Sequence, residues 1–205
     1  MRKVGITLRS SDAPDYHEPR DALARDWYRF LAATKGQFQW LLLPNLGQDT
    51  VEYALSHGVD ALLLTGGDDL GSYAERDSTE QCLLAHACKA TWPVLGICRG
   101  MQSLNEFWGG ELIVVSNEHH ASIHTLDLEC SLPWAPLAAQ LQVNSFHRQG
   151  IATPAHELRP IAWYNGVCET FIHETLPWVG IMWHPEREPV PTQHDKQLFE
   201  YLFGV

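Results

Sequence analysis

A cysteine between two glycines, Cys98, is the residue of this chain best placed for covalent chemistry. An apolar run over residues 93–97 precedes it and an amphipathic segment beginning at Arg99 follows it, which is the strand–turn–helix pattern of a nucleophile elbow. Gly96 and Gly100 lack the Cβ atoms that such a turn would crowd. Free N–H groups at the start of the helix would face the sulfur and favour the thiolate, the form that attacks carbonyl carbons. A cysteine that merely packs in the core is the alternative interpretation.

A base and its carboxylate partner are expected near the C-terminus, at His184 and Glu186. They follow an apolar run over residues 178–182, and residues two apart on an extended chain point to the same side. Glu186 would then orient the imidazole, and His184 would accept the proton of Cys98. Taken alone, the segment also fits a surface His-Pro turn.

A glycine pair, Gly66 and Gly67, ends a leucine-rich run that predicts a buried strand. A turn without Cβ atoms can direct backbone N–H groups toward a ligand oxygen, and with the amide of Arg99 this turn would form an oxyanion hole. A glycine pair is also typical of any tight turn. Together, the three segments predict acyl transfer through a cysteine nucleophile.

Taken in this order, the three segments resemble the class I glutamine amidotransferase superfamily of Cys-His-Glu enzymes over nearly the whole chain. The elbow Gly-Ile-Cys-Arg-Gly-Met-Gln at 96–102, with residues 76–80 and 143–149, is most similar to the γ-glutamyl-γ-aminobutyrate hydrolase (peptidase C26) family, whose members hydrolyse γ-glutamyl amides. The turn Gly-Gly-Asp-Asp-Leu at 66–70 and residues 18–23 are similar to a compact branch, the γ-glutamyl-CDP-amidate hydrolases. Both an aminobutyrate-like and a nucleotide leaving group therefore stay open.

The resemblance implies a hydrolase in which Cys98 forms a γ-glutamyl thioester that water cleaves to release glutamate. It also implies polar contacts to the glutamyl group from one residue of the elbow helix and four after it: Gln102, Asn144, Ser145, Phe146 and His147. A solvent-facing helix residue and an ordinary loop histidine are the alternative interpretations of Gln102 and His147. A nucleotide leaving group would need cationic partners for its phosphates, with Arg9, Arg20 and Arg76 as candidates.

Two further functions are alternatives to a free-standing hydrolase. The chain could be a glutaminase subunit that delivers ammonia to a separate synthase, although Arg99 after the nucleophile resembles the hydrolases. A binding module on a degenerate amidotransferase fold would be expected to have lost a member of the catalytic set, and all three are present. The hydrolase is therefore the preferred hypothesis.

Charge and targeting signals limit the partners. A formal net charge of −11 disfavours nucleic acid and membrane surfaces, because phosphate binding relies on clustered Lys and Arg. The apolar start is too short for a signal peptide, and no segment has the roughly 20 apolar residues of a spanning helix. We expect a cytoplasmic enzyme acting on a small molecule, with homo-oligomerisation undetermined.

Cysteine and histidine spacing argues against a metal or cofactor. Five cysteines without a Cys-x-x-Cys pair suggest neither a disulfide framework nor a zinc knuckle: Cys82, Cys88, Cys98, Cys130 and Cys168. His119, His120 and His124 are clustered, but carboxylate and cysteine partners at ligand spacing are missing nearby. The sequence therefore predicts no metal and no cofactor.

Alternating apolar runs and amphipathic segments predict one domain over residues 1–205, a three-layer α/β sandwich. The first half suggests strands at 3–8, 39–43, 59–64 and 93–97 and helices at about 20–34, at 49–56, after a cap at Thr79, and from Arg99. Shorter runs at 112–115, 125–129, 142–145, 161–164, 167–173 and 178–183 suggest an added antiparallel layer, with Asn165-Gly166 as a type I′ hairpin turn. A last helix is expected at about 193–203. We thus predict a mostly parallel central sheet with helices on both faces, of the class I glutamine amidotransferase-like, flavodoxin-like kind.

Overall fold

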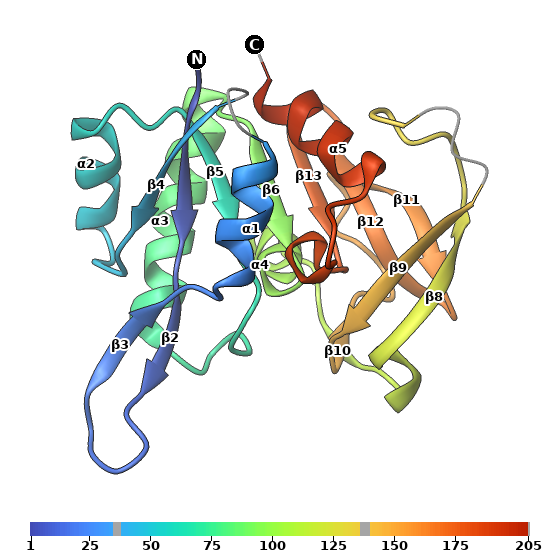
Figure 1. The fold of residues 1–205 in the computed structure, drawn as a ribbon, viewed down its shortest axis with the longest axis horizontal. Coiled ribbons are helices and arrows are strands. Elements are labelled where there is room, and N and C mark those ends of the chain that lie inside the picture. The colour runs from blue at the N-terminus through green and yellow to red at the C-terminus, as the bar shows by residue number, and fades with distance from the viewer. Residues whose placement is uncertain (35–37, 136–139, 205) are drawn as a thin grey trace.

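A nine-stranded sheet forms the centre of the protein in the computed structural model, which describes residues 1–34, 38–135 and 140–204 (Figure 1). Five strands run parallel: β4 (Gln39–Leu43), β1 (Lys3–Thr7), β5 (Ala61–Leu64), β6 (Val94–Ile97) and β13 (Trp178–Ile181). Four antiparallel strands continue the same sheet: β12 (Val167–His173), β11 (Leu158–Tyr164), β8 (His120–Leu128) and β9 (Leu141–Phe146). The carboxyl ends of the parallel strands meet at one edge, where α/β proteins place their sites.

Helices cover both faces of the sheet, as predicted (Figure 1). One face carries α1 (Asp26–Ala33) and α5 (Gln193–Phe203), which meet through Phe30 and Phe199 with ring centroids 4.6 Å apart. The other carries α2 (Asp49–Ser56), α3 (Ala74–Ala90) and α4 (Arg99–Phe107). The three-layer α/β class is therefore confirmed.

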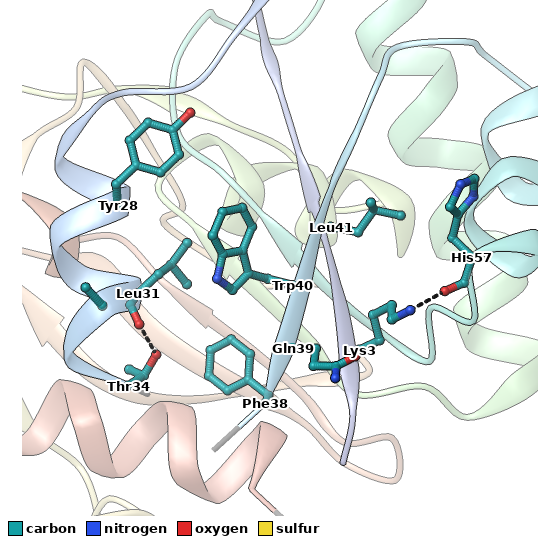
Figure 2. A pocket seen from close by; sticks show the side chains of 10 residues that line it. Lys3, Tyr28, Leu31, Thr34, Phe38, Gln39, Trp40, Leu41 and His57 are labelled. Carbon is teal, nitrogen blue, oxygen red and sulfur yellow. Dashed lines mark hydrogen bonds between the residues drawn. The ribbon is translucent and has the colours of Figure 1, made fainter. Parts of the chain in front are cut away.

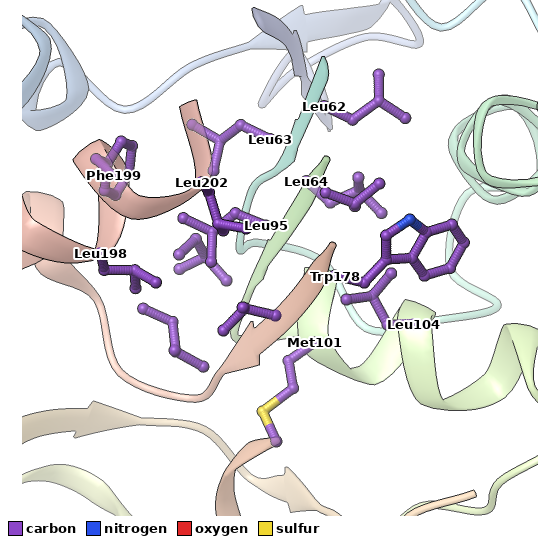
Figure 3. Close-up of a cluster of buried hydrophobic side chains, with 14 of the residues drawn as sticks. Leu62, Leu63, Leu64, Leu95, Met101, Leu104, Trp178, Leu198, Phe199 and Leu202 are labelled. Atoms are coloured by element: carbon purple, nitrogen blue, oxygen red, sulfur yellow. The ribbon is translucent and has the colours of Figure 1, made fainter. Parts of the chain in front are cut away.

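Side chains of β5 show how both faces of the sheet are buried. In Figure 3, Leu63 points toward Leu202 of α5, whereas Leu64 lies on the opposite side with Leu104 of α4. Leu62, Leu63 and Leu64 are completely buried. A strand covered on both faces reads as a continuous apolar run, which is why the Ala-Leu-Leu-Leu sequence indicates a central parallel strand.

The run at 178–183 differs from the prediction, because β13 is not part of an antiparallel layer. It pairs in parallel with β6, Gly180 opposite Gly96, and antiparallel with β12, so it joins the two halves of the sheet. An apolar run shows that a strand is buried, but the direction of its neighbours depends on segments far away in sequence. This position places the residues after β13 beside the end of β6.

The helix expected at about 20–34 begins only at Asp26. Residues before it form β3 (Pro19–Ala22), which pairs with β2 (Arg9–Asp12) in a hairpin that projects beyond the carboxyl edge of the sheet (Figure 1). Pro19 has no N–H to donate, which suits the end of a two-stranded ribbon. The site edge thus has an arm that the sequence did not predict.

Other boundaries differ more modestly. Thr79 is not a cap, because α3 begins at Ala74 and the Thr79 hydroxyl instead accepts the Gly47 N–H at 2.8 Å. Asn165 and Gly166 both have positive φ, 46° and 77°, as the predicted type I′ turn between β11 and β12 requires. The remaining short elements are β7 (Ile113–Val114), β10 (Gln149–Gly150), η1 (Asn117–His119) and η2 (Pro185–Arg187). Within the described ranges, every helix is too short or too polar to cross a bilayer.

Candidate active site

Cys98 lies in a strained turn between β6 and α4. Its φ of 50° and ψ of −105° are unusual for a residue with a side chain, and its N–H donates to the Ile181 carbonyl oxygen at 2.8 Å. A Cβ on Gly96 would lie 2.6 Å from the Gly100 carbonyl oxygen, and one on Gly100 would collide with the Leu64 carbonyl oxygen. Only glycine fits at both positions, so the predicted elbow is present with Cys98 at its apex.

His184 follows β13 and lies in the same buried space as Cys98. Its Nδ1 is 2.7 Å from Oε1 of Glu186, which leaves Nε2 as the other ring nitrogen. Asn144 holds the backbone on both sides: its Oδ1 accepts the His184 N–H and its Nδ2 donates to the His184 carbonyl oxygen, each at 2.9 Å. Neither the ring nor its carboxylate partner is free to rotate away.

The environment of His184 favours the imidazolium. Burial alone would lower the pKa of His184, but its electrostatic and hydrogen-bond contacts with Cys98 and Glu186 outweigh burial and raise the pKa to about 9. A cysteine and a histidine in this relationship can hold one proton between them. The arrangement is that of a nucleophile, a base and an orienting carboxylate.

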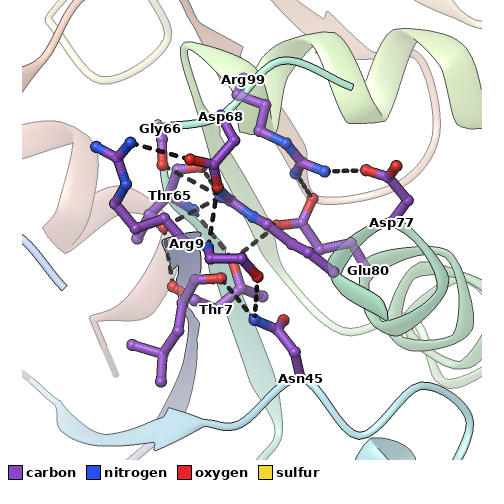
Figure 4. Close-up of polar contacts among 12 residues, drawn as sticks. Thr7, Arg9, Asn45, Thr65, Gly66, Asp68, Asp77, Glu80 and Arg99 are labelled. Atoms are coloured by element: carbon purple, nitrogen blue, oxygen red, sulfur yellow. Dashed lines mark hydrogen bonds and ion pairs between the residues drawn. The ribbon is translucent and has the colours of Figure 1, made fainter. Parts of the chain in front are cut away.

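The glycine turn after β5 is held by a buried arginine (Figure 4). Nη2 of Arg76 donates to the carbonyl oxygens of Thr65 at 2.8 Å and Gly66 at 3.1 Å. In a trans peptide the N–H points opposite to the C=O, so the N–H groups of Gly66 and Gly67 are directed away from Arg76. A Cβ on Gly66 would lie 2.7 Å from Cε1 of His184, which places this turn against the histidine ring.

Glu80 of α3 connects this turn to the elbow (Figure 4). Its Oε1 lies 3.2 Å from Nε of Arg76, and its Oε2 accepts from Arg99, whose guanidinium also bonds Asp77. Burial alone would raise the pKa of Glu80, but Arg99 and Arg76 outweigh burial and hold the pKa below its usual value. Two cations thus share one buried carboxylate, a network that the sequence pattern did not reveal.

This network corrects the expectation that Arg76 would bind phosphate. The side chain is completely buried and also pairs with Asp68 at 3.1 Å. Arg9, half-exposed, pairs with the other oxygen of Asp68 at 2.9 Å, and Arg20 pairs with Glu18 on the projecting hairpin. Of the three arginines, Arg9 lies nearest the glycine turn, because a Cβ on Gly67 would be 2.9 Å from Cβ of Arg9.

A cavity of about 160 Å³ opens beside Cys98. Of the predicted substrate contacts, Gln102, Phe146 and His147 line it, and Gln102 donates to the Gln149 carbonyl oxygen at 2.9 Å. Asn144 and Ser145 are not lining residues, because Asn144 clamps His184 and Ser145 donates to the His119 carbonyl oxygen. The complete lining is Gly67, Asp69, Cys98, Arg99, Gln102, Phe146, His147, Arg148 and Gln149.

The peptidase C26 family model matches residues 4–186, a span that contains every element of this site. The chain belongs to the peptidase C26 family. This membership supports an amide hydrolase, and it confirms the family that the motifs around Cys98 resemble.

Several relatives place this C26 chain among the glutamine amidotransferase-like proteins. It is 28% identical over 192 residues to a gamma-glutamyl-CDP-amidate hydrolase of Campylobacter jejuni, covering 90% of each chain. It is also 26% identical to the protein NtpR-like group's more distant neighbour, a glutamine-hydrolysing GMP synthase component of Methanothermobacter thermautotrophicus, covering 80% of this chain and 83% of the relative. A solved glutamine amidotransferase from Thermotoga maritima shares the fold, with a TM-score of 0.67 at 18% identity over 97% of this chain and 81% of that one.

A larger cavity, of about 650 Å³, lies elsewhere on this C26 chain (Figure 2). It is found between α1 and β4, where Tyr28, Phe38 and Trp40 face one another, and Lys3 and His57 border it. Its lining contains no thiol, hydroxyl-activating base pair or carboxylate that matches the Cys98 arrangement. Cavity size therefore does not identify the reactive site in this protein, whereas chemistry does.

Proposed function

We propose that this chain hydrolyses a γ-glutamyl amide through a thioester on Cys98. The observation that carries the proposal is the convergence of the Cys98 elbow, the His184–Glu186 pair and the Gly66–Gly67 turn at one edge of the sheet. Membership of the peptidase C26 family supports the reaction class.

In the first half of the reaction, the Cys98 thiolate attacks the δ-carbonyl carbon of the glutamyl group. The N–H groups of Arg99 and of Gly67 or Gly66 stabilise the oxyanion. The C–N bond then breaks as His184 gives its proton to the leaving nitrogen. The products at this point are a free amine or amidate and a γ-glutamyl thioester.

In the second half, His184 takes a proton from water, which attacks the thioester carbon. The same N–H groups stabilise the second oxyanion, and collapse of this intermediate expels the Cys98 thiolate and releases glutamate. Glu186 keeps the ring tautomer fixed and stabilises the imidazolium in both halves.

Exposed charges at the cavity suit the two ends of a glutamyl group. Asp69 and Arg148 both line it, and neither makes an ion pair within the part of the chain that the structure describes. An α-ammonium group would pair with Asp69 and an α-carboxylate with Arg148, because charge-assisted hydrogen bonds are the strong ones. Together with Gln102, these residues form the proposed glutamyl subsite.

The leaving group must extend beyond this cavity. At about 160 Å³ it suits an amino-acid-sized group and is below the ~300–1,000 Å³ typical of sites for larger ligands. A second hollow of about 30 Å³, on the His184 side of Gly67, is bordered by Arg9 and Arg187. Two guanidinium groups there favour an anionic leaving group, so we propose a γ-glutamyl nucleotide amidate rather than an aminobutyrate conjugate, as for the Campylobacter jejuni relative.

Purified chain without any added partner tests the proposal. We expect faster glutamate release from a γ-glutamyl-CDP amidate than from γ-glutamyl-γ-aminobutyrate or glutamine, because contacts with the remote part of a substrate lower the barrier. Cys98→Ala should abolish release, and Cys82→Ala, as the matched control, should retain it. Activity of Cys98→Ala would contradict the thioester, and activity only after a synthase is added would favour the ammonia-delivering subunit.

A further inference from the structure

We propose that this protein binds a structural Zn²⁺ ion beneath its glutamyl subsite, in a cluster of three histidines and one carboxylate: His119, His124, His147 and Glu169. All four side chains are buried, and one donor atom from each lies within 4.8 Å of the other three. The sequence predicted no metal because it showed no carboxylate near His119 and His124. Strand β12 supplies that carboxylate from about 45 residues further along the chain.

The separations fit a tetrahedral zinc site. Bonds of about 2.0–2.1 Å require neighbouring donor atoms about 3.3–3.4 Å apart. Oε1 of Glu169 lies 3.3 Å from Nε2 of His147, 3.5 Å from Nδ1 of His119 and 3.9 Å from Nε2 of His124. An ion would need to draw only the wider pairs together.

The donor atoms have no other strong partner. Both oxygens of Glu169, both ring nitrogens of His124, Nδ1 of His119 and Nε2 of His147 are buried without a hydrogen bond. Such atoms cost free energy unless something satisfies them, and buried charges are normally paired or bound to metal. A divalent cation would satisfy one atom of each residue at once.

The surroundings also orient a ligand. Nδ1 of His147 lies 2.9 Å from the Gln149 carbonyl oxygen. A carbonyl can only accept, so the proton sits on Nδ1 and the lone pair of Nε2 faces the cluster, as is usual for metal-binding histidines. The His119 segment is held in turn by the hydroxyl of Ser145, which donates to the His119 carbonyl oxygen.

Four protein ligands in a closed, buried shell are typical of structural zinc, because catalytic sites keep an open position. The ligands come from η1, β8, the segment after β9, and β12, so the ion would join the outer hairpin to the sheet. His147 and Gln149 also line the cavity beside Cys98, and Gln149 accepts from Gln102. The ion would thus stabilise one wall of the glutamyl subsite without taking part in the chemistry.

Metal content and stability test this proposal without an activity assay. Cys98 and His184 could themselves capture Zn²⁺, so we would use Cys98→Ala protein, purified, stripped with a chelator and then titrated with Zn²⁺. We expect one equivalent of zinc by elemental analysis, a Tm raised by about 5–10 °C, and tetrahedral visible absorption bands when Co²⁺ replaces Zn²⁺. Less than 0.1 equivalent with an unchanged Tm, or zinc bound by wild type but lost in Cys98→Ala, would overturn the proposal.

Ligand variants in the same Cys98→Ala background locate the ion. His124→Ala and Glu169→Gln should each lose the zinc-dependent rise in Tm and the Co²⁺ bands, with circular dichroism reporting whether they fold. His120→Ala is the matched control, because His120 is an exposed neighbour outside the cluster and should retain both. Full zinc binding by folded Glu169→Gln and His124→Ala proteins would place the metal elsewhere. If both variants fail to fold, the titration of Cys98→Ala protein decides alone.

Discussion

Arg76 bonds the carbonyl oxygen of Gly66 at 3.1 Å and thereby sets the direction in which the next N–H points. Arg99 supplies the opposing N–H of the proposed oxyanion hole from the first position of α4. The side chains of both arginines end on the carboxylate of Glu80. One buried ion network therefore fixes the two halves of this hole relative to each other, although none of its charged groups would touch the substrate.

Arg76→Lys should lower kcat by about tenfold to a hundredfold with little change in KM. Lysine keeps the charge beside Glu80 but cannot hold two carbonyl oxygens in the arginine geometry, and loss of one oxyanion donor costs about 10²–10³ in kcat. Steady-state kinetics on one γ-glutamyl amide would measure the change. Arg159→Lys, at an exposed arginine, is the control and should match wild type. A rise in KM at constant kcat would show that Arg76 acts on substrate binding instead.

The pKa of His184, raised to about 9, predicts how stability and activity depend on pH. A histidine whose pKa is raised by folding contributes stability that is complete below its unfolded value of about 6.5 and is lost as pH rises through about 9. Hydrolysis should fall over the same upper range, because the imidazolium protonates the leaving nitrogen.

Cys98→Ala separates this interaction from other alkaline effects. It removes one of the contacts that raise the pKa of His184, so the NMR titration midpoint of the ring should move to lower pH. The decrease of Tm between pH 7 and pH 10 should also be smaller than in wild type. An identical His184 titration in both proteins would show that the sulfur does not interact with the ring.

The sequence predicted the elbow well because its determinants are local. A buried strand, two glycines around Cys98 and an amphipathic helix are adjacent in the chain, and each has its own steric reason. The His184–Glu186 pair was equally accessible, since the two residues are only two positions apart. What the pattern could not give was that β13 lies beside β6 and so brings this pair to the cysteine.

The supporting charges were harder to predict. Arg76 and Glu80 are spaced i,i+4 on α3, a pattern that normally indicates a solvent-exposed ion pair on a helix surface. Only the packing of α3 against the end of β5 buries them. Glu169 was missed because the spacing rules for metal ligands apply within short segments, whereas the sheet brings this residue to histidines from β8 and β9.

Replacing Glu186 tests the third member of the proposed triad. Glu186→Gln should reduce kcat less than His184→Ala, because the amide keeps a hydrogen bond to Nδ1 but lacks the charge that stabilises the imidazolium. His184→Ala should be nearly as inactive as Cys98→Ala, since nucleophile and base act as a unit. Single-turnover measurements of thioester formation would rank the three variants. Wild-type activity in Glu186→Gln would remove this residue from the mechanism.

Arg9→Ala should change substrate preference rather than chemistry. Arg9 borders the small hollow on the leaving-group side of Gly67 and is half-exposed, so it can reach a phosphate by exchanging its Asp68 partner. Losing a charge-assisted contact should raise KM for a γ-glutamyl nucleotide amidate by about tenfold, and the ratio of its kcat/KM to that of glutamine should fall accordingly. Arg20→Ala is the matched control, because Arg20 lies on the same hairpin but pairs with Glu18 and lines neither hollow. An unchanged ratio in Arg9→Ala, or an equal fall in Arg20→Ala, would mean that the hairpin does not read the leaving group through Arg9.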